Sequence, residues 1–135
     1  MSMVMIMLSL LSVQFLTGMY ANLFVPLYIH GGPVYGMYGM MNFMFLAGGA
    51  LMPHMALGMV IAVFAVFVFA ISALVPNRNL LLATAGLVSV LLAGGAGISF
   101  MLTGFQNDAY SFLMAVCWLS AFISYFLMLS PVPYK

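Results

Sequence analysis

Four long, almost entirely apolar stretches of this chain alternate with short segments rich in glycine and proline. A membrane helix needs about 20 apolar residues to cross about 30 Å of hydrocarbon, and each stretch is that long. The predicted membrane-spanning helices cover residues 3–27, 50–75, 80–103 and 110–130. The pattern therefore predicts an all-α integral membrane bundle of four transmembrane helices, formed by residues 1–135 as one domain.

The second stretch is harder to delimit, because the sequence has no charge from residue 34 to residue 75. One straight helix over that range would be about 63 Å long, roughly twice the bilayer. Pro53 favours a helix start nearby, since proline is tolerated in the first turn. We therefore predict that residues 34–47 form an interfacial or re-entrant segment. If they cross the membrane instead, the bundle has five helices and the N-terminus changes sides.

The three formal charges, Arg78, Asp108 and Lys135, set the expected orientation. Four spans place Arg78 and Lys135 on one side, and cationic loops stay in the cytoplasm. Both termini are therefore expected in the cytoplasm. Asp108 falls on the outer side, where Asn107 or Asp108 can cap the fourth helix.

The composition excludes several classes of protein. Charged residues are 2% of the chain, against about 25% in a soluble domain, and apolar residues are 67%. Disordered chains need the opposite balance, and two scattered cations give no nucleic-acid footprint. With one aspartate and no glutamate, the sequence has no carboxylate pair for acid–base catalysis. We expect a chain that is not an enzyme by itself, surrounded by lipid and binding no nucleic acid.

Small residues four positions apart predict where the helices meet, because close approach holds helices together in lipid. The residues expected inside the bundle are Gly18, Gly58, Ala62, Ala85, Ser89, Ala93 and Gly97. Gln14 and Asn22 share the stripe of Gly18, and His54 shares that of Gly58. The small residues of the fourth span are less regular, so we expect that helix to lie outermost.

Four polar residues are expected near the outer membrane face: Asn22, His30, His54 and Asp108. The two histidines could ligate the iron of haem b, or His54 and Asp108 could bind a quinone head group. In the structural alternative, His54 hydrogen-bonds Asn22 or a carbonyl group across the bundle. We expect no cofactor as first choice and no metal. The fifteen methionines suggest Cu(I) chemistry, but methionine is also an ordinary apolar filler.

Several segments resemble an uncharacterised family of small prokaryotic four-helix integral membrane proteins. These segments are residues 14–23 (QFLTGMYANL), His30-Gly31, residues 54–58 and residues 107–115 (NDAYSFLMA). The resemblance implies four helices and carries no known activity. In size and polarity the chain is also similar to accessory subunits of respiratory oxidases.

The expected function is a non-catalytic accessory or structural subunit of a larger membrane complex, respiratory or otherwise energy-transducing. Its partners would be other integral membrane subunits. Two alternatives stay open: a small membrane protein that binds haem or quinone at the outer polar site, and a small oligomeric transporter or channel.

Overall fold

The computed structural model describes residues 2–24, 51–74 and 79–130. These residues form four helices: α1 (Ser2–Phe24), α3 (Leu51–Leu74), α4 (Asn79–Leu102) and α5 (Asp108–Leu127). All four are long and apolar enough to cross a membrane, and the described ranges contain no strand. The chain is therefore an all-α, multi-pass membrane protein in contact with lipid. The helix bounds differ from the predicted spans by one to three residues, and residues 34–47 lie outside the described ranges.

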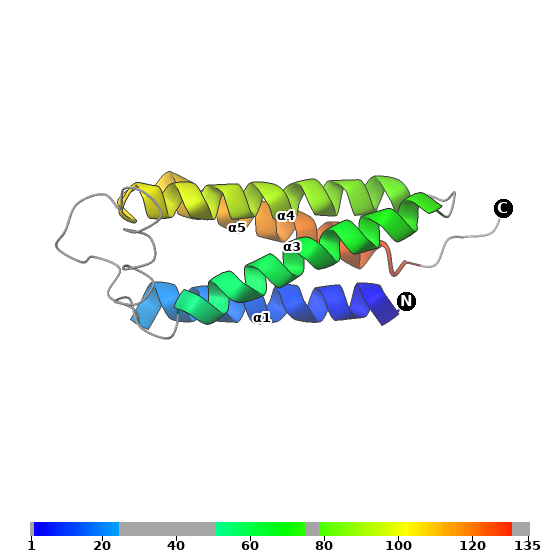
Figure 1. Cartoon of the computed structure of the whole chain (residues 1–135), viewed down its shortest axis with the longest axis horizontal. Helices are drawn as coiled ribbons and strands as arrows, with labels where there is room; N and C mark the ends of the chain where they lie inside the picture. The colour runs from blue at the N-terminus through cyan, green and yellow to red at the C-terminus, as the bar shows by residue number, and fades with distance from the viewer. Residues whose placement is uncertain (1, 25–50, 75–78, 131–135) are drawn as a thin grey trace.

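The helices run alternately up and down and form one elongated bundle (Figure 1). α1 contacts α3 and α5, and α4 contacts the same two helices. α3 crosses the bundle obliquely, from α1 at its beginning toward α4 at its end. We call the end of the bundle where α1 and α4 finish and α3 and α5 begin the loop end.

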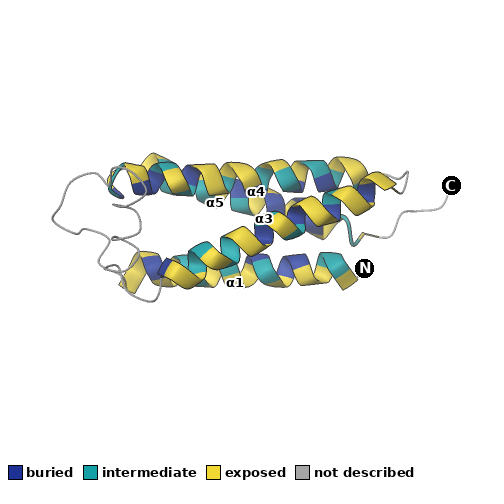
Figure 2. Cartoon of the chain, viewed as in Figure 1, coloured by how far each residue is buried: buried dark blue, intermediate teal, exposed yellow. Residues whose placement is uncertain are grey.

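Two apolar clusters fill the interior. The cluster away from the loop end is built around Met7, Ile61, Ala65, Ala121 and Tyr125. The cluster at the loop end contains Ala21, Leu51, Phe100, Met101 and Phe105. Buried residues face the bundle axis and exposed residues face outward (Figure 2). Most of the outward surface is apolar, which suits a protein whose solvent is hydrocarbon.

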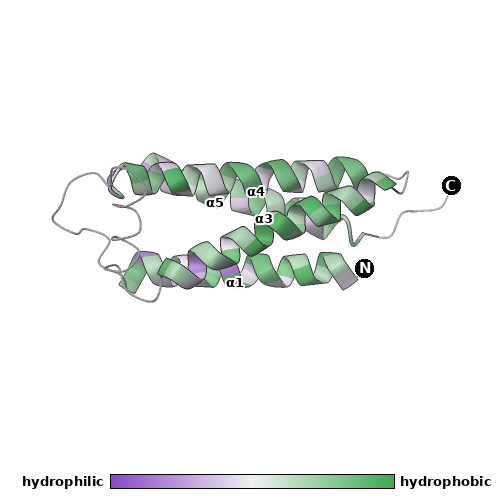
Figure 3. Cartoon of the chain, viewed as in Figure 1, coloured by the Kyte–Doolittle hydropathy of each residue, from purple (hydrophilic) through white to green (hydrophobic). Residues whose placement is uncertain are grey.

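Hydrophilic residues lie toward the loop end, on α1 and α3 and in the turn between α4 and α5 (Figure 3). In that turn, Gly104 and Phe105 both have positive φ angles, of 64° and 60°. Phe105 tolerates this conformation because its ring is buried edge-on against Phe100 at 5.2 Å. Asn107 caps α5, since its Oδ1 accepts a hydrogen bond from the N–H of Ala109 at 3.2 Å. Before it, the N–H groups of Gly104 and Phe105 donate to the carbonyl oxygens of Met101 and Phe100, so the turn closes α4 and opens α5.

The buried face of α4 differs from the predicted stripe. Ala85 is exposed, and Ser89, Ala93 and Gly97 are half-buried. The face that is buried instead passes through Ala83, Gly86 and Val90, at alternating spacings of three and four. Each step of four residues turns about 40° further round a helix of 3.6 residues per turn, so a strict spacing of four leaves the contact face. The expectation that Ala85 points inward is wrong for this reason.

The expectation that the last helix lies outermost is also wrong. α4 and α5 share the most extensive interface of the bundle. Ala121 and Tyr125 of α5 are fully buried. A Cβ atom placed on Gly86 would lie 2.6 Å from Cζ of Tyr125, so the tyrosine ring fills the space left by the missing side chain. Bulky residues on α5 pack closely because glycines on α4 make room for them.

Candidate functional site

The most polar contact between described helices joins α1 to α3. Gln14 and Gly18 lie four apart on α1, and His54 and Gly58 lie four apart on α3. Because the helices are antiparallel, each polar side chain rests on the glycine of the other helix. A Cβ on Gly18 would lie 2.8 Å from Cε1 of His54, and one on Gly58 would lie 3.3 Å from Nε2 of Gln14. Glycine at both positions lets the helices approach closely enough for the polar groups to meet.

Three hydrogen-bond distances connect this site. Nε2 of Gln14 lies 3.3 Å from Nε2 of His54, and Nδ1 of His54 lies 3.2 Å from Oγ1 of Thr17. Thr17 Oγ1 donates to the backbone carbonyl oxygen of Gln14 at 3.0 Å. We call the set of Gln14, Thr17 and His54 the polar clasp. All three side chains are half-buried, and both ring nitrogens of His54 have a partner on α1.

One acceptor atom of the polar clasp has no hydrogen-bond donor in the described part of the chain. Oε1 of Gln14 is buried and receives no hydrogen bond from any described residue. A buried acceptor without a donor costs roughly 1–3 kcal/mol. This atom is therefore the natural partner for a proton donor that arrives at the site.

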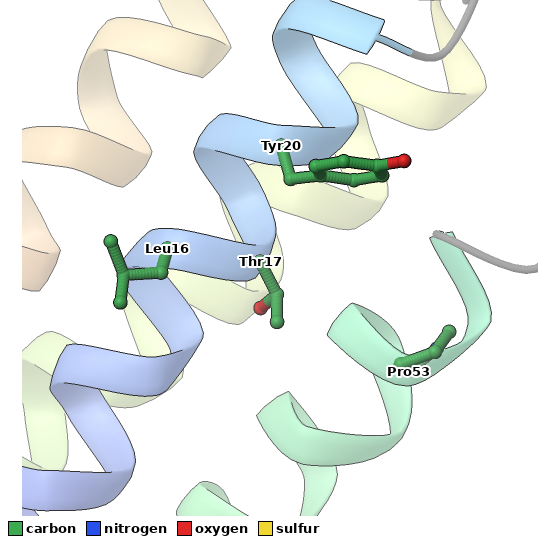
Figure 4. A pocket seen from close by; sticks show the side chains of 4 residues that line it. All are labelled: Leu16, Thr17, Tyr20 and Pro53. Carbon is green, nitrogen blue, oxygen red and sulfur yellow. The ribbon is translucent and has the colours of Figure 1, made fainter.

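A shallow cleft of about 350 Å³ opens beside the polar clasp, between α1 and the start of α3. Its lining residues are Leu16, Thr17, Tyr20 and Pro53 (Figure 4). Thr17 projects from α1 toward α3 and is shared by the cleft and the clasp. Since the walls are almost entirely apolar, the cleft suits an acyl chain or another apolar group better than a polar molecule.

A second polar contact joins α1 to α5, and the sequence reasoning missed it. The indole Nε1 of Trp118 donates to the carbonyl oxygen of Leu11 at 2.9 Å. The indole ring stacks with Phe15 and with Phe122, at centroid distances of 4.7 and 5.4 Å. The one signal in the sequence was the position of the tryptophan in mid-span, away from the interfacial belt where tryptophan is usually found.

The residues predicted to form an outer cofactor site are not all brought together. His54 belongs to the polar clasp, whereas Asn22 is exposed on the last turn of α1 and Asp108 is exposed on the first turn of α5. The ring of His54 contacts Gln14 and Thr17 instead of the expected Asn22. His30 lies outside the described residues. For His54 to ligate a haem iron, its ring would first have to release one of its two partners on α1.

The described residues include no group of three or more histidine, cysteine, aspartate or glutamate side chains placed to hold a metal ion. No family model, curated protein or solved structure matches the chain. The described residues form a bundle of four membrane-spanning helices that contains the polar clasp, and the resemblance seen in the sequence stays a prediction.

Proposed function

We propose that the chain is a non-catalytic structural subunit of a larger integral membrane assembly, and that α4 carries the surface contacting the partner. The observation that carries the proposal is a pair of outward-facing glycines in the middle of this helix, Gly94 and Gly95. Both are exposed, and a Cβ atom on either would meet no other atom within 4 Å.

The other glycines within the described helices supply the comparison. Gly18, Gly58, Gly86 and Gly97 each lie under a side chain of a neighbouring helix, at 3.3 Å or less from the position of a Cβ atom. In this protein a helical glycine thus usually marks a place where another helix comes close. Gly94 and Gly95 have the same character but no neighbour within the described part of the chain.

Such glycines are costly without a partner. Glycine in a helix interior is about 1 kcal/mol less favourable than alanine. Lipid tails gain nothing from a smooth backbone, whereas a second helix can approach it closely and pack against it. Thr84 and Ser99 lie on the same side of α4 as Gly95, and their small side chains also allow another helix to approach that side closely. A helix of another subunit crossing at Gly95 would recover the cost of both glycines.

The use of polar side chains supports a structural role. Gln14, Thr17, His54 and Trp118 all make contacts between helices of the chain itself. Several serine and threonine hydroxyl groups elsewhere donate to the backbone of their own helix, as Ser99 does to the carbonyl oxygen of Gly95. Polar side chains that bond within the chain hold the bundle together, and few polar side chains are then left to bind a substrate.

Purification from native membranes in mild detergent tests the proposal. We expect a stoichiometric membrane partner with the unchanged chain and loss of that partner with Gly95→Leu, while the bundle stays folded. The matched control is Val66→Leu, which also enlarges an exposed outward position but lies on α3. Migration of the unchanged chain as a lone particle, or a partner retained by Gly95→Leu, contradicts the proposal.

The nature of the partner decides the finer part of the proposal. We propose an energy-transducing complex, following the similarity in size and polarity to accessory subunits of respiratory oxidases. Oxidase or dehydrogenase subunits in the purified assembly would support it. If the stoichiometric partner is a transporter or channel, the proposed subunit role is supported and the proposed energy-transducing role is contradicted.

A further inference from the structure

We propose that the polar clasp is a proton-binding site in which the side-chain amide of Gln14 turns by half a rotation when His54 takes up a proton. The inference rests on the direction of the hydrogen bonds around the imidazole ring and on the unused acceptor of Gln14. It is independent of the proposed subunit role.

The direction of the hydrogen bonds follows from Thr17. Its hydroxyl group has one proton, and the carbonyl oxygen of Gln14, 3.0 Å away, can only accept. The proton therefore goes to that carbonyl, and Oγ1 is left to accept from Nδ1 of His54 at 3.2 Å. A neutral imidazole has a single N–H, so Nε2 has no proton and accepts from the amide of Gln14 at 3.3 Å. The three hydrogen bonds thus run in one direction: the Gln14 amide donates to His54, His54 donates to Thr17, and Thr17 donates to the Gln14 carbonyl oxygen.

Proton uptake reverses one of these bonds. On acidification the lone pair of Nε2 takes a proton from a hydronium ion at the loop end, whose O–H bond breaks to leave water. The ring becomes an imidazolium with a charge of +1, and the hydrogen bond from the Gln14 amide to Nε2 is lost. Its new Nε2–H then faces the NH₂ group of Gln14, which is also a donor. A half-turn of the amide replaces this group by Oε1, the buried oxygen that has no donor in the neutral state. The two bonds of Thr17 keep their directions.

The groups around the ring explain why the amide matters. Of the helices packed against α3, α1 carries one titratable side chain, Tyr20, and α4 carries none. α5 contributes Asp108 and Tyr110 near the loop end, and neither side chain has a hydrogen bond to His54. No carboxylate of the described helices therefore contacts the charged ring. Oε1 of Gln14 and Oγ1 of Thr17 are the two acceptors that would hydrogen-bond the imidazolium between α1 and α3.

Nitrogen NMR of the protein in lipid bilayers tests this inference, with histidine and glutamine labelled. The signal of His54 is identified by its disappearance in His54→Gln. At high pH we expect a proton on Nδ1 and none on Nε2, with the Gln14 NH₂ group in contact with the ring. On acidification we expect both ring nitrogens to be protonated and the NH₂ group to turn away from the ring, while His54 stays in contact with Gly18.

Two variants sharpen the result. Gln14→Met keeps the length of the side chain without its amide, so His54 should contact Gly18 at high pH and move away from it in acid. Gln106→Met removes an exposed amide from the turn before α5 and should leave the titration unchanged. A neutral ring with its proton on Nε2 would overturn the inference, as would an NH₂ group that stays against the protonated ring. The measurements on the unchanged chain decide the question even if Gln14→Met does not fold.

Discussion

The interfaces α1–α3 and α4–α5 join neighbouring antiparallel helices by different means. Between α4 and α5, glycines on one helix receive bulky side chains from the other, as Gly86 receives Tyr125. Between α1 and α3, glycines on both helices receive polar side chains, as Gly18 receives His54. The first interface depends on shape and the second on shape and hydrogen bonds. The same residue, glycine, is therefore required by both for the same geometric reason.

The two interfaces should differ in stability and in how readily their geometry changes. Packing between apolar surfaces has no alternative arrangement of similar energy, so the α4–α5 pair should behave as a rigid unit. Hydrogen bonds between helices in lipid contribute modestly, about 0.6 kcal/mol on average and about 1.7 at most. The α1–α3 pair is then the interface whose geometry can respond to a proton or a neighbour.

Gly86→Ala should have the largest effect, because the new Cβ atom would lie 2.6 Å from Cζ of a fully buried tyrosine. Overpacking of this kind costs about 1–3 kcal/mol. The free energy of unfolding, measured by SDS titration in mixed micelles, gives the value. Gly94→Ala on the same helix meets no atom and serves as the control. Equal stability of the two variants would show that the α4–α5 interface is not the rigid one.

Removal of the polar clasp should cost less. A double-mutant cycle with His54→Ala and Gln14→Ala should give a coupling free energy of about 0.6–1.7 kcal/mol, since the two side chains share one hydrogen bond in lipid. The same titration in mixed micelles measures it. Additive effects of the two substitutions would mean that the 3.3 Å contact between Gln14 and His54 contributes nothing to the α1–α3 interface.

Trp118→Phe should have a smaller effect still. Phenylalanine keeps an aromatic ring beside Phe15 and Phe122 but removes the hydrogen bond to the carbonyl oxygen of Leu11. A neutral hydrogen bond contributes about 0.5–1.5 kcal/mol, and this carbonyl group also belongs to the hydrogen-bond ladder of α1. We expect a loss of stability near the lower end of that range. Backbone hydrogen exchange should become faster in the first half of α1 and stay unchanged in α4.

The sequence predicted the helices well and their contacts only in part. Length and hydropathy fix where a helix can span, because every backbone polar group in lipid must be paired within the segment. Contacts depend on which side of each helix faces inward. The spacing of four placed Gly18 and Gly58 on inward faces, and both lie under side chains of the polar clasp. It also placed Ala85 inside the bundle, whereas the structure has Ala85 exposed. Over a long helix a strict spacing drifts away from the contact face, and only the neighbouring helix determines where the face lies.

The candidate site shows a similar limit. The sequence singled out His54 because an ionisable residue within a span is unusual, and this reasoning needs no structure. It did not predict that Thr17 and Gln14 would be its partners, because residues 37 and 40 positions apart are joined only by the antiparallel crossing of α1 and α3. Asn22 was an equally reasonable partner by composition. Its exposure follows from its position on the last turn of α1, beyond the crossing.

Gly97→Ala should have the smallest effect and is the sharpest test of the comparison. A Cβ at Gly97 would lie 3.1 Å from Sδ of Met114, which is close to the end of a flexible side chain. Methionine adapts to irregular space, so a shift of a few tenths of an ångström should absorb the methyl group. We expect a change within about 0.5 kcal/mol, well below that of Gly86→Ala. If the two alanine variants cost the same, close approach of the backbones, and not the fit of the tyrosine ring, holds α4 against α5.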